Sequence, residues 1–300
     1  MYINQLKNTL RFDNVPLQTI SVKEKSRNHD ISILRLDMLH PQVSGNKWFK
    51  LQYYLDGFFR SGKGVLATFG GAYSNHIAAT AAACQLLEIP CVGWIRGEEP
   101  AQYSPTLERA VHQGMQLRFV ERTAYRNKEK IMSENPDYYW IPEGGYGHLG
   151  MLGAADIWNY VSQKETYSHV FLAVGSGTTT AGILHGATIG QHIMGVSVMK
   201  NNLSLEKEIA ALASPSEMSQ LQLLHGFHFG GYAQKNDELL AFMHDMWQQY
   251  RIPLDFVYTA KAFYALMQEA REGNFSEKNK VLFIHTGGLQ GNQSLSREGK

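Results

Sequence analysis

Short apolar runs alternate with longer segments of helical spacing along most of this chain. From Trp48 to Phe59, large apolar side chains recur every three or four positions, which predicts a helix with one buried face. Runs such as "GVLATFGG" are apolar throughout and end in glycine, which is typical of buried strands. The expected strands are Ile31–Leu39, Gly64–Gly71, Cys91–Ile95, Leu117–Val120, Tyr138–Pro142, His169–Gly177, Ile193–Val198 and Lys280–Gly288. The expected helices are Trp48–Phe59, Ile77–Leu87, Thr106–Gln113, Gly150–Gln163, Thr180–Ile189, Leu205–Leu212, Asp237–Tyr250 and Lys261–Glu272.

Strands that are apolar throughout and alternate with helices predict an α/β fold with mostly parallel sheets covered by helices. We expect two domains. Residues 1–50 and 150–300 would form the larger one, and residues 51–149 the smaller one, with a ligand between them. The polar segment Arg122–Asn135 is expected to be an exposed helix.

Composition narrows the class of protein. The 300 residues carry a net charge of +1, so there is no electrostatic case for nucleic acid or an anionic membrane as a partner. No window approaches the apolar length of a membrane span, and Met1–Phe12 contains no signal-peptide pattern. Cys84 and Cys91 form no CxxC or ligand cluster, so a reduced, cytoplasmic protein is expected.

Three strand-to-helix junctions are rich in glycine and polar residues. In "VGSGTTTAG", Val174 to Gly182, glycines allow the backbone to approach an anion, and the following helix start favours phosphate. The Walker lysine and a complete G-x-G-x-x-G motif are absent, which favours a small phosphorylated cofactor over a nucleotide. A tight turn with a threonine N-cap is the structural alternative.

The other two junctions do not identify a site by themselves. "TFGGAYSNHIAATAA" places Ser74 and Asn75 at a helix start, where N-capping is the simpler interpretation. "VLFIHTGGLQG" ends a strand with His285, and a lone histidine there is more often a core residue than a ligand. His225 and His228 have no partner cluster at ligand spacing, so no metal site is expected. The motifs HExxH and G-x-S-x-G are absent from the sequence.

The stretch "SGNKWFKL" places Lys47 after a polar turn and before a helix. A lysine taken alone is best explained as a solvated surface residue. Together with a phosphate cradle and hydroxyl-rich loops, Lys47 instead suits a lysine that holds pyridoxal 5′-phosphate as a Schiff base.

The motifs "SGNK", "GGAYSNH", "GSGTTTAG", "DFVYTAKA" and "FIHTGG" occur in the order found in fold type II pyridoxal-phosphate enzymes. From about Ile31 to Gly288 the chain resembles the 1-aminocyclopropane-1-carboxylate deaminase and D-cysteine desulfhydrase family. The resemblance implies a tryptophan synthase β-like fold, a small amino acid as substrate and a homodimer. One loop departs from the pattern, because "GGAYSNH" is one residue shorter than the usual "GGAIQSNH".

The resemblance also implies roles for particular residues. Lys47 matches the Schiff-base lysine, Asn75 the residue that hydrogen-bonds the phenolic oxygen of the cofactor, and Ser74 the serine at the substrate carboxylate. Tyr258 matches a tyrosine over the cofactor, and Tyr232 a second active-site tyrosine. Phosphate contacts are implied for Gly175, Ser176, Gly177, Thr178 and Thr179.

Thr259 distinguishes two branches of that family. The deaminases have a glutamate at this position, whereas the desulfhydrase branch has a hydroxyl that would pair with the pyridine nitrogen. A hydroxyl leaves that nitrogen mostly unprotonated, and the weaker electron sink suits β-elimination better than cyclopropane opening. The leading expectation is a D-cysteine desulfhydrase-like lyase that gives pyruvate, ammonia and hydrogen sulfide. The alternatives are a 1-aminocyclopropane-1-carboxylate deaminase, which gives 2-oxobutanoate and ammonia, and a non-catalytic homologue that binds the cofactor or a ligand.

Overall fold

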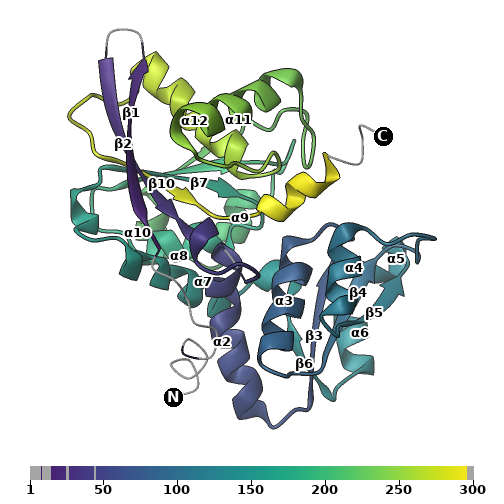
Figure 1. Cartoon of the computed structure of the whole chain (residues 1–300). Coiled ribbons are helices and arrows are strands. Elements are labelled where there is room, and N and C mark those ends of the chain that lie inside the picture. The colour runs from purple at the N-terminus through teal and green to yellow at the C-terminus, as the bar shows by residue number, and fades with distance from the viewer. Residues whose placement is uncertain (1–7, 9–14, 25–26, 44, 296–300) are drawn as a thin grey trace.

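The computed structural model describes residue 8 and residues 15–24, 27–43 and 45–295. Two separate sheets form its framework (Figure 1). The larger has the strand order β1-β2-β10-β7-β8-β9, and only β1 is antiparallel to its neighbour. The smaller has the order β5-β4-β3-β6 and is entirely parallel. The strands are β1 (Leu17–Glu24), β2 (Arg27–Arg35), β3 (Val65–Gly70), β4 (Cys91–Arg96), β5 (Gln116–Val120), β6 (Tyr138–Ile141), β7 (His169–Val174), β8 (His192–Ser197), β9 (Leu221–Leu224) and β10 (Val281–His285).

Helices cover both faces of the larger sheet. Apolar residues of α11 and α12 pack with one face of its strands, and those of α7, α8 and α9 pack with the other (Figure 1). The helices are α2 (Asn46–Ser61), α3 (Asn75–Leu86), α4 (Pro105–His112), α5 (Arg122–Tyr125), α6 (Lys128–Glu134), α7 (His148–Ala155), α8 (Thr178–Gly186), α9 (Leu205–Ala210), α10 (Pro215–Met218), α11 (Asp237–Tyr250) and α12 (Thr259–Glu272). The expected α/β class with mostly parallel sheets is confirmed.

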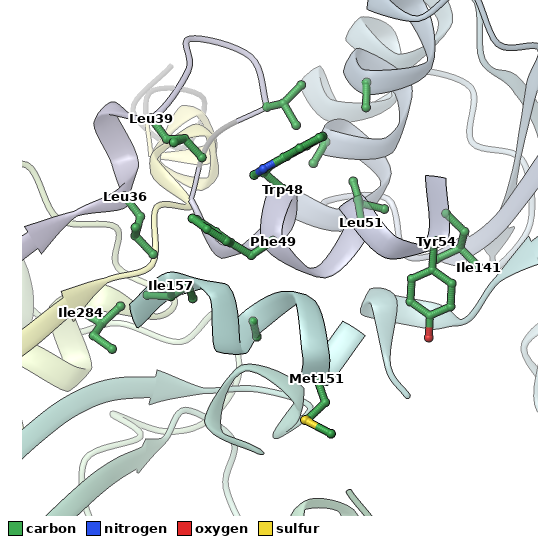
Figure 2. Packing of buried hydrophobic residues seen from close by; sticks show 14 of the residues in the cluster. Leu36, Leu39, Trp48, Phe49, Leu51, Tyr54, Ile141, Met151, Ile157 and Ile284 are labelled. Atoms are coloured by element: carbon green, nitrogen blue, oxygen red, sulfur yellow. The ribbon is translucent and has the colours of Figure 1, made fainter. Parts of the chain in front are cut away.

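Helix α2 joins the two sheets through a shared core. Its apolar residues Trp48, Leu51 and Leu55 are fully buried, as the three- and four-residue spacing predicts. Figure 2 shows side chains of α2 among neighbours from both halves of the molecule. Ile141 of β6 and Ile284 of β10 belong to the same apolar cluster. Any group at the start of α2 is therefore held against both sheets at once.

Several expected boundaries are shifted in the structure. The strand expected over Ile31–Leu39 is β2, which starts earlier and ends at Arg35. There the Arg35 guanidinium donates to both carboxylate oxygens of Asp37, and a short 3-10 helix (Leu36–Met38) follows. The helix expected over Gly150–Gln163 is α7 followed by a 3-10 segment (Asp156–Tyr160).

Other expectations were incomplete. Strands β1 and β9 were not expected, because their apolar positions alternate with polar ones rather than forming continuous runs. The segment expected as one exposed helix forms α5 and α6, and it buries Tyr125 and Ile131 beside Phe69. The division at residues 51–149 stays a prediction, although the smaller sheet lies within residues 65–141. Among the described residues, no helix combines the length and apolarity that crossing a bilayer requires.

Candidate active site

A cavity of about 430 Å³ lies at the carboxyl ends of strands from both sheets. Its wall combines the turns after β3, β7 and β10 with the first turn of α2. Ligands of open α/β sheets bind at such strand ends, and the volume suits a small molecule. The three glycine-rich junctions and the lysine, which are far apart in the sequence, therefore meet at one place.

Lys47, the second residue of α2, is half-buried in this wall. Its Nζ donates to Asn46 Oδ1 at 2.8 Å and lies 5.9 Å from the centroid of the Tyr258 ring. Burial lowers the pKa of Lys47 to about 8, although the carboxylate of Asp255 opposes this shift. A usable share of neutral amine is therefore present near neutral pH, as attack on a carbonyl carbon requires.

The turn before Lys47 depends on Gly45. Gly45 has a φ of +70°, and a Cβ at this position would collide with the carbonyl oxygen of Thr286. Asn46 N donates to that same oxygen at 3.1 Å, and Asn46 Nδ2 donates to Thr179 Oγ1 at 2.8 Å. These bonds fix the start of α2 against both β10 and α8. Ser44 of the same turn lies outside the described residues.

The junction between β7 and α8 is built like an anion cradle. Gly177 caps α8 with a φ of +78°, and within the described part of the chain no side-chain cap accepts a hydrogen bond from the first amides of the helix. These amides have no partner within the helix either, so they are free for a ligand. Gly175, Ser176, Gly177 and Thr179 line the cavity. Thr178 is fully buried and does not line it, and its hydroxyl is 3.3 Å from the Ser176 hydroxyl.

Lys50 adds a buried amine to this cradle. It is one helical turn beyond Lys47, lines the cavity, and its Nζ donates to Ser176 Oγ at 3.4 Å. Burial, followed by the charge of Lys47, lowers the pKa of Lys50 well below its usual value. An anion at the start of α8 would offset this cost, because it would supply the charge partner that the ammonium lacks.

The junction between β3 and α3 presents Ser74, Asn75 and His76 to the same cavity. Ser74 Oγ also accepts from Ile77 N at 3.3 Å, so the capping interpretation is correct as far as the local structure goes. His76 Nε2 is 2.8 Å from Thr68 Oγ1, whereas its buried Nδ1 has no partner in the described part of the chain. Burial and then the charges of Lys50 and Lys47 lower the pKa of His76 well below its usual value.

Tyr258 and Tyr232 face each other on the cavity wall. The two rings meet edge to face at 6.0 Å, and the Tyr258 hydroxyl donates to the Tyr232 hydroxyl at 3.4 Å. Burial raises the pKa of Tyr258 well above its usual value. Lys261 holds the loop of Tyr232, because its Nζ donates to the carbonyl oxygens of His228 and Gly231 at 2.8 and 2.7 Å.

Thr259 does not line this cavity. Its hydroxyl accepts from Asp255 N and donates to Asp255 Oδ1, both at 2.8 Å, and the side chain is fully buried at the start of α12. Thr259 is the first residue of α12 and not its cap, and the Asp255 carboxylate accepts from Tyr258 N and Thr259 N at this helix start. The contact of Thr259 with a pyridine nitrogen therefore stays a prediction. Thr286, immediately after β10, is the threonine of this region that lines the cavity.

Several wall residues received no role from sequence reasoning, and among them are Lys50, Thr180, Thr286 and Arg96. Lys50 had a detectable signal, since it lies on the same helical face as Lys47. Thr180 has a buried Oγ1 with no partner among the described residues, which no sequence pattern indicates. Arg96 is the last residue of β4 and Thr286 follows β10, but many residues at the carboxyl ends of strands belong to no site.

The chain is similar to known proteins over nearly its whole length. Residues 9–287 match the model of the family described as "Pyridoxal-phosphate dependent enzyme". A provisionally named 1-aminocyclopropane-1-carboxylate deaminase of Pyrococcus horikoshii is 30% identical over 92% of this chain and 90% of its own. A D-cysteine desulfhydrase of Yersinia pestis is 27% identical, with 91% of each chain covered.

Solved structures agree with these relatives. The crystal structure of an "ACC deaminase homologue" matches with a TM-score of 0.77 and 26% identity, covering 98% of this chain and 97% of that chain. A hydrogen sulfide-producing enzyme of Fusobacterium nucleatum has a TM-score of 0.68 at only 10% identity, so it is evidence for the fold alone. Family match, relatives and fold lead to one assignment: the chain belongs to the family of pyridoxal-phosphate dependent enzymes.

Proposed function

We propose that this enzyme is a lyase that removes ammonia from a small amino acid, with D-cysteine as the leading substrate. The products would be pyruvate, ammonia and hydrogen sulfide. One observation carries the proposal: the Lys47 amine, with its pKa lowered to about 8, shares a cavity with an uncapped helix start and with Ser74 and Asn75. One ligand-sized space therefore offers an amine for a carbonyl, a helix start for a phosphate and polar side chains for an amino-acid carboxylate.

The residues of the cavity fit pyridoxal 5′-phosphate. The partnerless Thr180 hydroxyl, the free amides of α8 and the Lys50 ammonium suit its phosphate. Lys47 suits its carbonyl carbon, and Asn75 would hold its phenolic oxygen. When bound, the cofactor supplies an electron sink for the electron pair released at the substrate Cα.

The substrate would bind between the two junctions. Ser74, at the start of α3, would orient its carboxylate, since a helix N-terminus favours an anion. Lys47 in its neutral form would take the proton from Cα, which the elimination to pyruvate does not return there. Tyr258 keeps its proton at neutral pH, because burial raises its pKa well above the usual value. With Tyr232, it is therefore available to donate a proton to the leaving sulfur.

A neutral partner of the pyridine nitrogen remains part of this proposal. Thr259 has the family position for that role, and Thr286 has a place on the cavity wall. Both are hydroxyl residues, so either one leaves the ring a weaker electron sink than a carboxylic acid would. Such a ring favours substrates that carry a good leaving group on Cβ.

The second candidate is 1-aminocyclopropane-1-carboxylate deaminase activity. It is supported by the provisional name of the Pyrococcus horikoshii relative, at 30% identity. A non-catalytic homologue that binds the cofactor is the third. D-cysteine desulfhydrase activity is preferred because a threonine, not a glutamate, occupies position 259.

The experiment that tests the proposal uses purified protein loaded with pyridoxal 5′-phosphate. We expect an absorbance band near the visible edge that is lost in Lys47→Ala, and release of pyruvate and hydrogen sulfide from D-cysteine. Release of 2-oxobutanoate from 1-aminocyclopropane-1-carboxylate without reaction of D-cysteine would favour the second candidate. The band without any turnover across a panel of small D- and L-amino acids would favour the third.

Two further expectations belong to this proposal: a homodimer and a cytoplasmic location. The compartment is supported by Cys84 and Cys91, which are buried free thiols. The dimer rests on the family resemblance, and light scattering of the purified protein at several concentrations tests it.

A further inference from the structure

Arg96 is a charged residue of the cavity wall that the chemistry above does not use. It is the last residue of β4 and is exposed. A Cβ built on Gly71 would lie 3.6 Å from Arg96 Nη2, so the guanidinium lies beside the start of the loop that carries Ser74 and Asn75. Within the described part of the chain, Arg96 makes no ion pair with a carboxylate and no side-chain hydrogen bond.

The balance of charge in the cavity leaves Arg96 without a partner even after the cofactor is bound. Its phosphate would be matched by Lys50 and the start of α8, and the substrate α-carboxylate by the start of α3. The acidic residues of the wall are already engaged. Glu143 pairs with Lys128 at 3.0 Å, and Glu208 accepts from Ser204 at 2.8 Å.

A second cavity of about 660 Å³ adjoins the first at Arg96 and Ala72, which line both. It lies beyond the carboxyl ends of β4 and β5, and its wall includes Phe119 and Arg122. A substituent that extends from the substrate toward Arg96 therefore has space beyond it. Glu98 and Glu121 also line this cavity, but neither is within ion-pair distance of Arg96.

We infer that Arg96 forms an anion subsite for the side chain of the substrate, so that small amino acids with a phosphate or sulfonate group on Cβ are preferred over neutral ones. Arginine suits this role because its planar fork matches such oxyanions with two hydrogen bonds. The inference rests on the proposed lyase function and replaces D-cysteine, its leading substrate, by small amino acids with an anionic group on Cβ. In the reaction, Cα loses a proton and the bond from Cβ to the leaving group breaks, with the electron pair departing on the oxyanion. With one water, O-phosphoserine thus gives pyruvate, ammonia and phosphate.

The turnover test compares O-phosphoserine and S-sulfocysteine with the neutral substrates cysteine and β-chloroalanine, each as both enantiomers. Wild-type holoenzyme should have a higher kcat/KM for the anionic pair. Arg96→Gln should lower kcat/KM for that pair roughly 10- to 100-fold, the range of a hydrogen bond to a charged group. It should leave the neutral pair within about threefold, as for a typical exposed substitution. Arg96→Lys keeps the charge but not the fork, so it should recover part of the loss.

Arg122→Gln is the matched control, because it removes the same charge from the second cavity without touching the first. It should leave the preference for anionic substrates unchanged. An equal loss in this variant would mean that general electrostatic attraction, not a subsite at Arg96, sets the preference.

Equilibrium binding provides a readout that does not need turnover. By calorimetry, wild-type holoenzyme should bind D-aspartate more tightly than D-alanine, and Arg96→Gln should abolish that difference. An aspartate-to-alanine ratio that is unchanged in Arg96→Gln would overturn the subsite. Absence of turnover for all four substrates, with the binding ratio still dependent on Arg96, would instead count against the lyase function alone.

Discussion

The two glycine-rich junctions that face Lys47 look alike in sequence, but they differ in whether a side chain caps the helix that follows. At β3–α3, Ser74 Oγ accepts from Ile77 N at 3.3 Å, so one helix amide is already satisfied. At β7–α8, the cap is Gly177 with a φ of +78°, and no side chain of the described residues caps the amides. At the first junction, Ser74 caps α3 and also lines the cavity. At the second, the amides at the start of α8 are available to bind an anion. The identity of the cap residue, not the number of glycines, separates the two.

The largest effect should come from closing the open junction. In Gly177→Ala, the new Cβ would lie 2.5 Å from Ile209 Cγ1, and its φ of +78° is unfavourable for alanine. Left-handed strain alone costs about 1–2 kcal/mol, which corresponds to roughly 5- to 30-fold in an equilibrium constant. The clash with Ile209 adds to this cost, so the dissociation constant for pyridoxal 5′-phosphate should rise roughly 100-fold or more. Gly71→Ala is the control at the capped junction, because its Cβ would meet Arg96 at an ordinary 3.6 Å. Absorbance titration of the two apoprotein variants with pyridoxal 5′-phosphate measures both dissociation constants. Equal affinities in Gly177→Ala and Gly71→Ala would contradict the idea that only the β7–α8 junction binds the phosphate.

Removing the cation behind the open junction should have the next largest effect. Lys50→Met deletes the partner of the phosphate and should weaken cofactor binding roughly 10- to 100-fold, as for a charge-assisted hydrogen bond. The apoprotein should be no less stable at pH 7. A lysine whose folded pKa is lowered destabilises the fold at every pH below its unfolded pKa, and methionine removes that cost.

Lys128→Met is the control for Lys50→Met, since Lys128 forms a partly exposed ion pair with Glu143. Its effect on cofactor affinity should be small. A Lys50→Met apoprotein that melts well below wild type would mean that the ammonium stabilises the fold without the phosphate, contrary to the sign worked out here.

The pH dependence of cofactor attachment sharpens the role of Lys47 between the two junctions. Its pKa is lowered to about 8, so below that pH the neutral amine should increase roughly tenfold per pH unit. The rate of reaction with pyridoxal 5′-phosphate should follow that rise and level off above pH 8. Stopped-flow absorbance on the apoprotein measures it. A rate that still rises steeply toward pH 10 would place the pKa near the usual lysine value.

The smallest expected change is in stability at the capped junction. Ser74→Ala and Ser214→Ala each remove a serine N-cap, from α3 and α10 respectively, and each should lower the free energy of unfolding by about 1 kcal/mol. Only Ser74 lines the cavity, so only Ser74→Ala should also reduce kcat. Denaturant unfolding and steady-state kinetics separate the two effects. Equal kcat values in both variants would leave Ser74 as a cap alone.

Most of the fold was predictable because its signals are local. The continuous apolar runs became β3, β4, β7, β8 and β10, within a few residues of their expected ends. The ends moved where side chains intervened, as at Arg35 and Asp37. Strands β1 and β9 were not predicted from the sequence because they lie at the edges of the sheet, where half of the positions need not be apolar.

The sequence by itself determined the alternation of strands and helices, the three polar junctions and the position of the lysine at a helix start. Each of these signals depends only on a few residues that are neighbours in the sequence. Only the tertiary structure decided which of these residues meet. It brought Lys47, Ser74, Asn75, Tyr232 and Tyr258 to one cavity with most of the phosphate loop. Thr178 and Thr259 are not part of that lining, and their hydroxyls lie within hydrogen-bond distance of Ser176 and Asp255. It also brought Lys50 and Arg96 to the cavity. The roles proposed for these two residues depend on their burial and on neighbouring charges, which come from parts of the chain that are distant in sequence.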